Sequence, residues 1–531
     1  MRIPKRPFIC AQCRLVRARP MRPFHGSIAR VSSSGEASPT DATTTFSSSA
    51  PRPTTAPRPN IDIKHIRQNA ALYAQNCLER NYRPQAEYPA RISALFEEWQ
   101  ARQRAARGLR ERSNLVRRQI ANPASIQHEG DDGGPPAAEA EALRAKPREA
   151  LLEEARELKR RLSAVEEDEA RLEAEMEDLA LAIPNLTSAE TPRGDEPRVL
   201  SYINDDGGGG DGDGPGPSSS ASDRVWRSHV HVGSELGLLD FAGAATSSGW
   251  GWYYLLDEGA QLEQALIQYA LAVVARHGWR RVAPPSVVYS HIASACGFQP
   301  RDQNGEQQVY ARSRGAGDAA RGRPELCLAG TAEIPLAGLK ANATLEAGEL
   351  PLRTVGVSRC YRAEAGARGA DTKGLYRVHE FSKVEMFAWT LPSADLAAEV
   401  FGEMLDVQTE ILGSLGLRCR VLEMPSADLG ASASRKCDIE AYFPSRRDGW
   451  GEVTSASICG DYQTRRLATR ARIDSRMTYP WTVNGTALAV PRVLAALLEN
   501  GWDEDEMSVT IPECLRPWMD GKDKIGPKHQ R

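Results

Sequence analysis

Two long helical patterns in tandem constrain the fold of this 531-residue chain more than any other feature. The first repeats every seven residues, at Ile92, Trp99, Ala106, Ser113 and Ile120. The second keeps the same spacing, at Leu151, Leu158, Val165, Leu172 and Leu179. Companion apolar residues complete a coiled-coil seam in each pattern, and only Arg102 and Glu169 interrupt it. Residues 122–136 are rich in Gly, Pro and Asp, so the two helices are expected to turn back as an antiparallel hairpin.

The two helices of this expected arm carry unequal charge. Residues 91–118 hold eight arginines and three glutamates, whereas residues 151–181 hold eleven acidic and five basic residues. The helices can therefore neutralise each other across the seam. A second interpretation adds to the first: arginines that face outward would bind RNA phosphates. The overall net charge of -3 excludes neither, because one basic face is enough to bind RNA.

The first 35 residues have the composition of a targeting segment. Eight of them are basic, several serines follow, and the first acidic residue is Glu36. This pattern is typical of a mitochondrial transit peptide, and a basic disordered tail is the alternative. Residues 36–59, rich in Ser, Thr, Pro and Ala, are expected to be a disordered linker.

The ten cysteines do not form the pattern of a disulfide framework, because most stand alone in a large chain. This spacing favours a reducing compartment. Cys10 and Cys13 make a lone CxxC, and no zinc site is expected there because zinc needs four ligands. No apolar run approaches the roughly 18–20 residues of a membrane helix.

The part of the chain after the arm has a mixed pattern. Residues 205–222 are nearly all Gly, Asp, Pro and Ser, which predicts a disordered insertion. From residue 223, strand-like runs alternate with separated helical patterns, which predicts an α+β domain built on an antiparallel sheet. The helices are expected near residues 259–277 and 395–415, and the strands near residues 281–288, 354–361, 383–389 and 418–422. Outside the glycine-rich residues 205–222, GxGxxG and GxxxxGK[ST] signatures are absent from the sequence, which excludes the usual dinucleotide and P-loop cradles.

Residues 360–385 form the first segment with candidate chemistry. A strand, a charged glycine-rich loop and a second strand follow one another there. The Arg362 guanidinium suits a phosphate, and the Glu364 carboxylate can accept from an adenine amino group. An aromatic ring on the second strand can stack on the base. Alone, the segment also fits an exposed charged hairpin.

Two later segments supply an acid and a further cation. Residues 452–455 read as a strand with one carboxylate and two hydroxyls, which suits magnesium or a half-exposed strand. Residues 484–492 read as a glycine turn entering an apolar helix. Arg492 near the first turn would place a cation beside an anion-binding helix end, although a plain turn and core helix fit equally.

Taken together and in order, these segments resemble the signatures of class II aminoacyl-tRNA synthetases. Residues 282–285 (VAPP) resemble the first motif, which forms the family's dimer interface, residues 360–385 the second, and residues 485–500 the third. Finer details are similar to the seryl-tRNA synthetase family over residues 60–531. They are TAE at 331–333, HEFSKVE at 379–385, NGT at 484–486 and LGLLDF at 236–241.

The resemblance implies an ATP site. Arg362 would bridge the α-phosphate and the serine carboxylate, and Arg492 would hold the γ-phosphate of a bent ATP. Glu364 would contact the adenine amino group, with Phe381 stacked beneath the ring. Glu452 and Ser455 would coordinate Mg²⁺. The remaining ATP-binding residues would be Ala363, Val378, Val453 and Thr454.

The resemblance also implies a serine pocket beside that site. Glu333 and Glu385 would receive the serine ammonium, and Thr486 and Asn484 would read its hydroxyl. Thr331, Ala332 and Arg362 would complete the pocket. A site that hydrogen-bonds one hydroxyl rejects a substrate lacking it by about 10⁴-fold or more.

The implied domain organisation covers most of the chain. It comprises a transit peptide (1–35), a linker (36–59), a tRNA-binding domain with the coiled-coil arm (60–186), the insertion (205–222) and a class II catalytic domain (223–531). The implied activity is an ATP-dependent, AMP-forming serine--tRNA ligase of the mitochondrial matrix. It would act on L-serine and tRNA(Ser) as a homodimer, without a membrane partner.

Two other functions stay open alongside this activity. One is a synthetase-like protein that binds tRNA or a partner without catalysis, and the other is a ligase that loads a carrier protein. The charged site residues disfavour the first, and the long arm disfavours the second. The sequence departs from the family at Ile458, where asparagine is familiar, and at Thr454 and Ala456.

Overall fold

A computed structural model describes residues 56–122, 145–205, 227–298, 308–313, 315, 317–318, 321–366, 374–446 and 449–527, without the side chains of residues 364 and 366. All of them belong to the compact unit Arg52–Arg531. The expected transit peptide, the CxxC cysteines, most of the linker, nearly all of the expected 122–136 turn and nearly all of the insertion lie outside the described residues.

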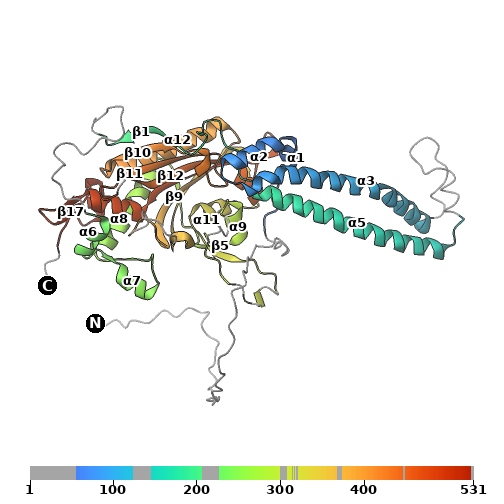
Figure 1. Ribbon diagram of the computed structural model, residues 1–531, viewed down its shortest axis with the longest axis horizontal. Coiled ribbons are helices and arrows are strands. Elements are labelled where there is room, and N and C mark those ends of the chain that lie inside the picture. Colours follow the sequence, from blue (N-terminus) through green and yellow to red (C-terminus); the bar gives the residue numbers. More distant parts are fainter. Residues whose placement is uncertain are drawn as a thin grey trace, which may run out of the picture. The chain divides into compact units, whose positions relative to one another are not determined.

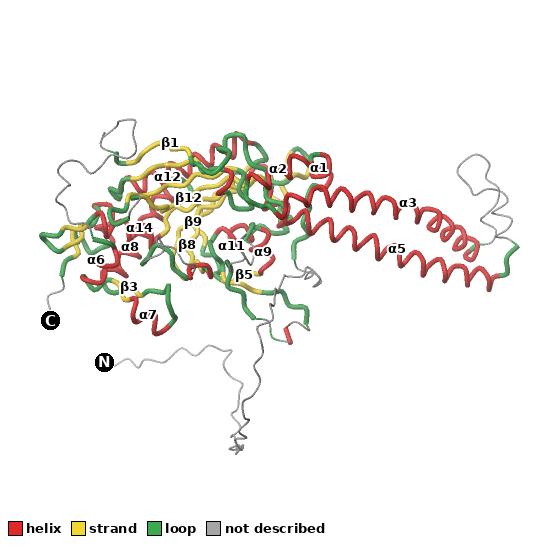
Figure 2. The backbone as a smooth tube through the Cα atoms, viewed as in Figure 1, coloured by secondary structure: helices red, strands yellow, loops and turns green. Residues whose placement is uncertain are grey.

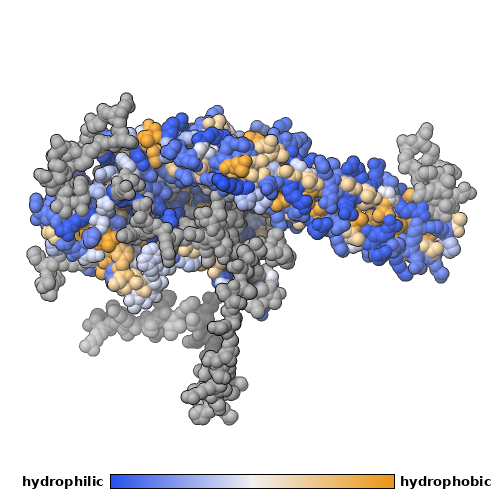
Figure 3. Space-filling view, viewed as in Figure 1, coloured by the Kyte–Doolittle hydropathy of each residue, from blue (hydrophilic) through white to orange (hydrophobic). Residues whose placement is uncertain are grey.

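The arm is a pair of long antiparallel helices, as predicted (Figure 1). Helix α3 spans Tyr88–Ala121 and helix α5 spans Arg148–Ala182. Their seam buries most of the heptad residues, among them Ile92, Ala106, Leu158 and Leu172. Helix α5 ends two residues before Pro184, which has no N–H to continue it. The visible face of the arm is mostly hydrophilic with small apolar patches, as a solvated arm requires (Figure 3).

The two charged residues that interrupt the seam are accommodated differently. The buried Glu169 accepts hydrogen bonds of 2.7 and 2.8 Å from Arg110 on α3, so its charge is paired inside the seam. Arg102 stays exposed and lies 3.9 Å from Asp168. Opposite charges therefore meet across the seam at both positions, which supports the interpretation of mutual neutralisation.

The segment expected as one short helix at residues 62–80 forms two helices. Helix α1 spans Ile63–Gln68 and α2 spans Ala70–Glu79, with a break at Asn69. The Asn69 amide donates to the His65 carbonyl at 2.9 Å, which competes with the helical backbone pattern. Ile66 and Cys77 of this pair pack on Ile92 and Leu172, so α1 and α2 form the root of the arm.

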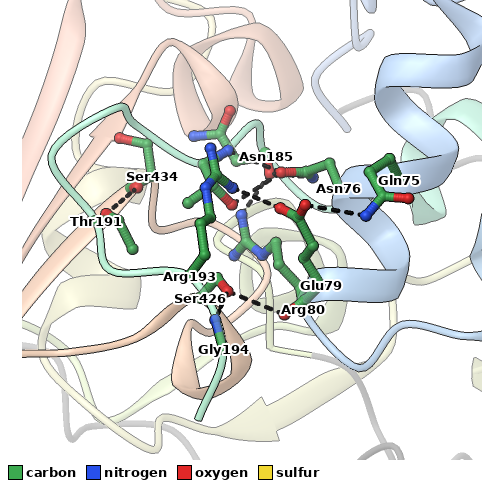
Figure 4. Close-up of polar contacts among 11 residues, drawn as sticks. Gln75, Asn76, Glu79, Arg80, Asn185, Thr191, Arg193, Gly194, Ser426 and Ser434 are labelled. Atoms are coloured by element: carbon green, nitrogen blue, oxygen red, sulfur yellow. Dashed lines mark hydrogen bonds and ion pairs between the residues drawn. The ribbon is translucent and has the colours of Figure 1, made fainter. Parts of the chain in front are cut away.

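The root of the arm is fastened to the larger domain by buried polar contacts (Figure 4). The buried Arg80 donates to the carbonyl oxygens of Asn185 and Gly430. The Asn185 amide donates in turn to the carbonyls of Ser432 and Cys459 at 2.9 and 2.8 Å. Residues far apart in the sequence therefore meet at this junction.

An eight-stranded sheet forms the larger domain, and the fold is α+β as predicted (Figure 2). Every neighbouring pair is antiparallel except β4 and β8. In spatial order the strands are β1 (Arg198–Ile203), β10 (Cys419–Glu423), β11 (Arg435–Tyr442), β12 (Trp450–Gly460), β15 (Trp481–Ala489), β9 (Glu380–Thr390), β8 (Leu352–Tyr361) and β4 (Arg280–Val282).

Strand β9 separates two hydrophobic cores because its side chains alternate between the faces of the sheet. Val384 and Met386 join the larger core with α8 (Glu258–Arg276), α12 (Ala394–Ser414) and α14 (Val490–Asn500). Phe387 and Trp389 join a smaller core on the other face. That core also contains residues of α9 (Ser290–Ala295), α11 (Glu333–Gly338) and α13 (Tyr462–Leu467). Lys383 and Glu385 have the same parity as Phe387, which places them on the face of the smaller core.

The remaining elements are short. They are α6 (His229–Glu235), β2 (Leu239–Asp240), α7 (Phe241–Ser247), β3 (Tyr254–Leu255), β5 (Val287–Tyr289), β6 (Leu326–Leu328), β7 (Thr344–Glu346), β13 (Arg470–Ile473), β14 (Arg476–Thr478), β16 (Trp502–Asp503), β17 (Ser508–Thr510) and β18 (Lys524–Ile525). The single strand expected at 281–288 is wrong: Pro284 and Pro285 separate β4 from β5, since proline has no N–H for a strand ladder. No helix in the described part of the chain is both long and apolar enough to cross a bilayer.

Candidate active site

A cavity opens where β9, β12 and β15 meet the start of α14. It contains about 660 Å³ of space between atoms, part of which is open to solvent. Most of the residues expected from the sequence to bind ATP line it. The lining residues are Arg362, Ala365, Tyr376, Arg377, Val378, Phe381, Lys383, Glu452, Val453, Thr454, Ser455, Thr486, Ala489, Pro491 and Arg492.

Arg492 and Glu452 form an ion pair in this cavity. Arg492 lies in the first turn of α14, and its Nη1 is 3.1 Å from the Glu452 carboxylate. Burial would raise the pKa of Glu452, but Arg492, Lys436 and Arg362 together hold it well below the usual range. The carboxylate is therefore ionised at neutral pH and the cavity contains a fixed pair of opposite charges.

The glycine turn expected at residues 484–486 is wrong, because these residues lie within strand β15. The structure gives Gly485 another purpose. A Cβ there would lie 3.0 Å from Met404 Sδ and 3.3 Å from Ala456 Cβ. The missing side chain lets helix α12 pack close to the sheet. Arg492 nevertheless lies near the start of a helix, as expected.

Arg362 follows directly after β8 and faces the same cavity. Its guanidinium carbon lies 5.3 Å from the centre of the Phe381 ring, and its backbone N–H donates to the His379 carbonyl at 2.9 Å. Val378 also lines the cavity, whereas Ala363 is not among the lining residues. Glu364 belongs to a short 3₁₀ turn, but its side chain lies outside the described residues.

The oxygen atoms beside Glu452 suit a magnesium ion. Ser455 lines the cavity, and its register partner on β11 is Asp438. The Asp438 Oδ1 is buried and has no hydrogen-bond partner among the described residues, while Oδ2 accepts from Lys436 at 2.7 Å. Burial raises the pKa of Asp438, Lys436 opposes this shift and Glu452 adds to it. Mg²⁺ prefers one or two carboxylates together with substrate phosphates, so this donor set fits it.

A second group of buried polar side chains adjoins the cavity. Lys383 and Thr486 belong to this group and also line the cavity. The Lys383 Nζ lies 2.6 Å from the Glu385 carboxylate, and the Thr486 hydroxyl donates to the same carboxylate at 3.0 Å. Thr486 and Glu385 are register partners on β15 and β9. All three side chains are buried. The group can therefore offer hydrogen bonds to a small polar substrate in a setting with little water.

Glu333 lies at the first position of α11 and belongs to the same buried group. The Gln463 amide donates to its carboxylate at 2.6 Å. Burial and the neighbouring Glu385 raise the pKa of Glu333 to about 7, against the opposing influence of Lys383, Gln463 and Asn484. Thr331 and Ala332 precede it and are buried. The structure thus brings Glu333, Glu385, Asn484 and Thr486 of the expected serine-binding residues together.

The comparisons with known proteins agree with this geometry. Residues 61–187 match the family described as "Seryl-tRNA synthetase N-terminal domain", and residues 318–501 match "tRNA synthetase class II core domain (G, H, P, S and T)". The mitochondrial serine--tRNA ligase of Schizosaccharomyces pombe is 36% identical over 459 residues, which cover 86% of this chain and 88% of that protein.

The chain belongs to the seryl-tRNA synthetase family.

Two further relatives agree with this membership. The mitochondrial serine--tRNA ligase of Saccharomyces cerevisiae is 48% identical over 300 residues, 56% of this chain and 65% of that protein. The seryl-tRNA synthetase of Pyrococcus horikoshii, solved in complex with ATP, is similar with a TM-score of 0.73 and 29% identity, covering 88% of this chain and all of that one. The chain is thus a class II aminoacyl-tRNA synthetase, a serine--tRNA ligase whose core is an antiparallel sheet.

The unfamiliar residue Ile458 of this seryl-tRNA synthetase does not border the ATP cavity. It lies on β12 between Arg435 of β11 and Val483 of β15, and its carbonyl accepts hydrogen bonds from Ser434. Its side chain is buried and joins the larger core. An isoleucine in place of the familiar asparagine therefore affects the packing of the larger core and not the lining of the cavity.

Two residues of the site were not singled out from the sequence. Lys383 appeared only inside a motif, although a lysine on a strand with many apolar residues is a signal for a buried ion pair. Gln463 lies between two charged residues, Asp461 and Arg465, which were singled out from the sequence. A neutral amide gives no comparable sign of a functional role. Only the fold brings Gln463 against Glu333, 130 residues earlier.

Proposed function

We propose that this seryl-tRNA synthetase activates L-serine with ATP in the cavity at Arg362, Glu452 and Arg492. A serine carboxylate oxygen attacks the α-phosphorus, the bond to pyrophosphate breaks, and seryl-adenylate forms. The observation that carries the proposal is the continuity of two sites. Thr486 and Lys383 line the cavity and also contact the buried Glu385. A nucleotide and a small polar amino acid can therefore bind side by side.

The cationic residues account for the ATP half of the site. Arg362 would hold the α-phosphate and the attacking carboxylate, and Arg492 would hold the γ-phosphate. Because no covalent enzyme intermediate is needed, alignment of the reactants and stabilisation of charge supply the catalysis. Phe381 lies on the same face of β9 as Lys383 and would stack on adenine, with Val378, Ala363, Glu364, Val453 and Thr454 around the nucleotide.

Magnesium belongs to the proposal through the oxygen donors of β12. Glu452 and Ser455 would hold the ion, which would neutralise phosphate charge when bound. The neighbouring Asp438 supports this assignment, because a buried carboxylate oxygen without a partner is costly unless something satisfies it. Arg492 keeps Glu452 ionised, which a magnesium ligand requires.

The acidic and hydroxyl side chains account for the serine half. Glu333 and Glu385 would receive the ammonium, and Thr486 with Asn484 would recognise the hydroxyl. Glu385 already shares one oxygen between Lys383 and Thr486, so it fixes the hydroxyl end of the pocket as well. Thr331 and Ala332 would form the wall beside Glu333.

The second step transfers the seryl group to the 3′ end of tRNA(Ser), with AMP as the leaving group. The arm supports this partner, because Arg104, Arg117 and Arg118 of α3 are exposed and would bind RNA phosphates. The arm extends away from the catalytic sheet (Figure 1), which suits an RNA large enough to reach both.

The proposal includes a homodimer. The VAPP segment at 282–285 begins at the last residue of β4, which is the terminal strand of the sheet. Val287, Tyr289 and Leu339 are large apolar residues of this region that are 50%, 43% and 54% exposed. A second copy that packs there would bury them. Sedimentation of the purified chain tests this assembly, and a monomer at micromolar concentration contradicts it.

The location is proposed as the mitochondrial matrix. The support is the basic, acid-poor composition of residues 1–35 and the mitochondrial names of both fungal relatives. Import of a fusion of residues 1–59 to a reporter tests the targeting role, and a cytosolic reporter contradicts it.

Amino-acid-dependent ATP–pyrophosphate exchange tests the activation step. We expect exchange with serine and little with alanine or threonine, followed by charging of mitochondrial tRNA(Ser). No exchange with serine would refute the proposal. Exchange without charging of any tRNA would favour the carrier-loading alternative.

A further inference from the structure

Gln463 lies outside the residues assigned so far, yet it contacts the centre of the serine pocket. It is fully buried on α13, and its Nε2 lies 2.6 Å from the Glu333 carboxylate. The Thr482 hydroxyl donates to the other end of the same amide, Oε1, at 2.7 Å. With Oε1 accepting from Thr482, the amide presents its NH₂ end to Glu333 and is a donor there.

Glu333 needs such a donor because its surroundings disfavour a carboxylate. Glu385 on β9 faces it with a like charge, and Lys383 on the same strand offers an opposite one. Cys296, which directly follows α9, and Cys459 on β12 also lie near it, and burial raises the pKa of both thiols, so both stay protonated. A neutral amide at 2.6 Å stabilises the ionised form and fixes its orientation.

The helix that carries Gln463 is also attached to the root of the arm. Arg466, three residues further along α13, donates to the carbonyls of Leu181 and Ile183 at 3.1 and 3.4 Å. Its guanidinium carbon lies 3.4 Å from the centre of the Tyr462 ring. One six-residue helix therefore touches the last residues of the arm at one position and the serine pocket at another.

We propose that Gln463 is a positioning residue for serine binding, which holds Glu333 toward the substrate ammonium, and that α13 ties this orientation to the root of the arm. The inference rests on the proposed role of Glu333. The inference also extends the role of Glu333. The affinity for serine would depend on contacts between α13 and the arm, although these contacts involve no substrate.

Exchange kinetics on Gln463→Met test the first half. The variant keeps the volume but loses the donor. We expect KM for serine to rise roughly tenfold to hundredfold, as for a lost hydrogen bond to a charged group, with kcat and KM for ATP nearly unchanged. Thr482→Val keeps the side-chain shape but removes the hydroxyl that donates to Gln463 Oε1, so the amide can rotate. This variant should raise KM for serine by a smaller factor.

The pH profile separates positioning from simple packing. In the wild type kcat/KM for serine should rise with pH through about 7, where Glu333 ionises. In Gln463→Met this rise should move to higher pH, because the carboxylate has lost its donor. Gln261→Met is the matched control, since that amide donates to Asp520 at 2.9 Å and contacts neither pocket.

Arg466→Lys tests the second half. It keeps the charge but cannot reach the same pair of carbonyls, and we expect a threefold or larger rise in KM for serine without tRNA. Arg193→Lys is the control, because Arg193 pairs with Glu79 at the same junction without contacting α13 (Figure 4). An unchanged KM in Arg466→Lys overturns the link to the arm.

Two outcomes overturn the role of Gln463. They are an unchanged KM for serine in both Gln463→Met and Thr482→Val, or a raised KM whose pH profile has not moved. Absence of serine-dependent exchange in the wild type is a different result, because it refutes the proposed function itself.

Discussion

Arg492 Nη1 lies 3.1 Å from the Glu452 carboxylate, and both side chains line the cavity proposed for ATP. The Arg492 guanidinium also donates to the Glu452 and Tyr376 carbonyls, so its position is fixed by the protein. A cation held in advance needs little reorganisation when charge moves onto pyrophosphate.

Arg492→Lys should lower kcat/KM for ATP in the exchange reaction by about 10²–10³-fold, because a lysine cannot reproduce the planar fork of the guanidinium. The measurement is pyrophosphate exchange at saturating serine. Arg470→Lys, at an exposed position on β13, serves as the control. A loss smaller than threefold in Arg492→Lys would remove Arg492 from the catalytic site.

Thr486→Val should weaken discrimination between serine and alanine. The change removes the hydroxyl that donates to Glu385 at 3.0 Å and keeps the side-chain shape. We expect the ratio of kcat/KM for serine to that for alanine to fall by at least about tenfold, since part of the polar complement of the substrate hydroxyl is lost. Exchange with both amino acids measures it. Thr390→Val, on the same sheet, is the control and should leave this ratio unchanged. An unchanged ratio in Thr486→Val would show that other residues recognise the serine hydroxyl.

The double change Arg117→Gln and Arg118→Gln should raise KM for tRNA in the charging reaction and leave exchange unaffected. Both arginines are exposed on α3. Removal of two phosphate contacts should reduce the slope of log affinity against log salt by about 1 for each contact. Charging assays between low and moderate salt measure this slope. Arg276→Gln on α8 is the control, and an equal slope in the arm variant would refute the RNA contact.

Glu499→Gln should make the free energy of unfolding less dependent on pH in the acidic range. Glu499 accepts hydrogen bonds from the His229 ring at 2.8 Å and from the Ser445 hydroxyl at 2.9 Å. Burial tends to raise the pKa of Glu499, but His229 and Ser445 lower it below its ordinary value. A lowered carboxyl pKa stabilises the fold above the unfolded pKa of about 4.3, and this contribution is lost as pH falls through the folded pKa.

Urea unfolding at pH 7 and at pH 4 measures this contribution. The variant should lose about 1–3 kcal/mol at pH 7 and show a smaller fall toward pH 4 than the wild type. Glu506→Gln at an exposed turn is the control. The same fall in wild type and Glu499→Gln would show that the carboxylate does not carry the acid sensitivity.

The regular parts of the fold could be predicted from the sequence because their periodicity is a local property. The heptads of α3 and α5, and the helices observed as α8 and α12, follow directly from the spacing of apolar residues. The break at Asn69 could not be predicted in this way, because apolar spacing carries no signal of the side-chain hydrogen bond that Asn69 makes there. Strand β15 was also not predicted from the sequence. Gly485 resembles a turn residue in the sequence, whereas its purpose depends on Met404 of a distant helix.

The site shows the same division between local and distant information. Arg362, Phe381, Glu452 and Arg492 were predicted through motifs, and all four line one cavity. Gln463 and Lys383 were not, because their roles come from pairing with residues that only the sheet brings close. The predicted roles for bound substrates stay predictions, as does the role of Glu364.

A crystal structure of the chain with a non-hydrolysable sulfamoyl analogue of seryl-adenylate tests the central claim most directly. We predict adenine stacked on Phe381, the sulfamoyl group at Arg362, and the serine ammonium within about 3.2 Å of the Glu333 carboxylate. An analogue bound outside the cavity of Arg362 and Arg492, or one whose ammonium faces away from both Glu333 and Glu385, would contradict the account.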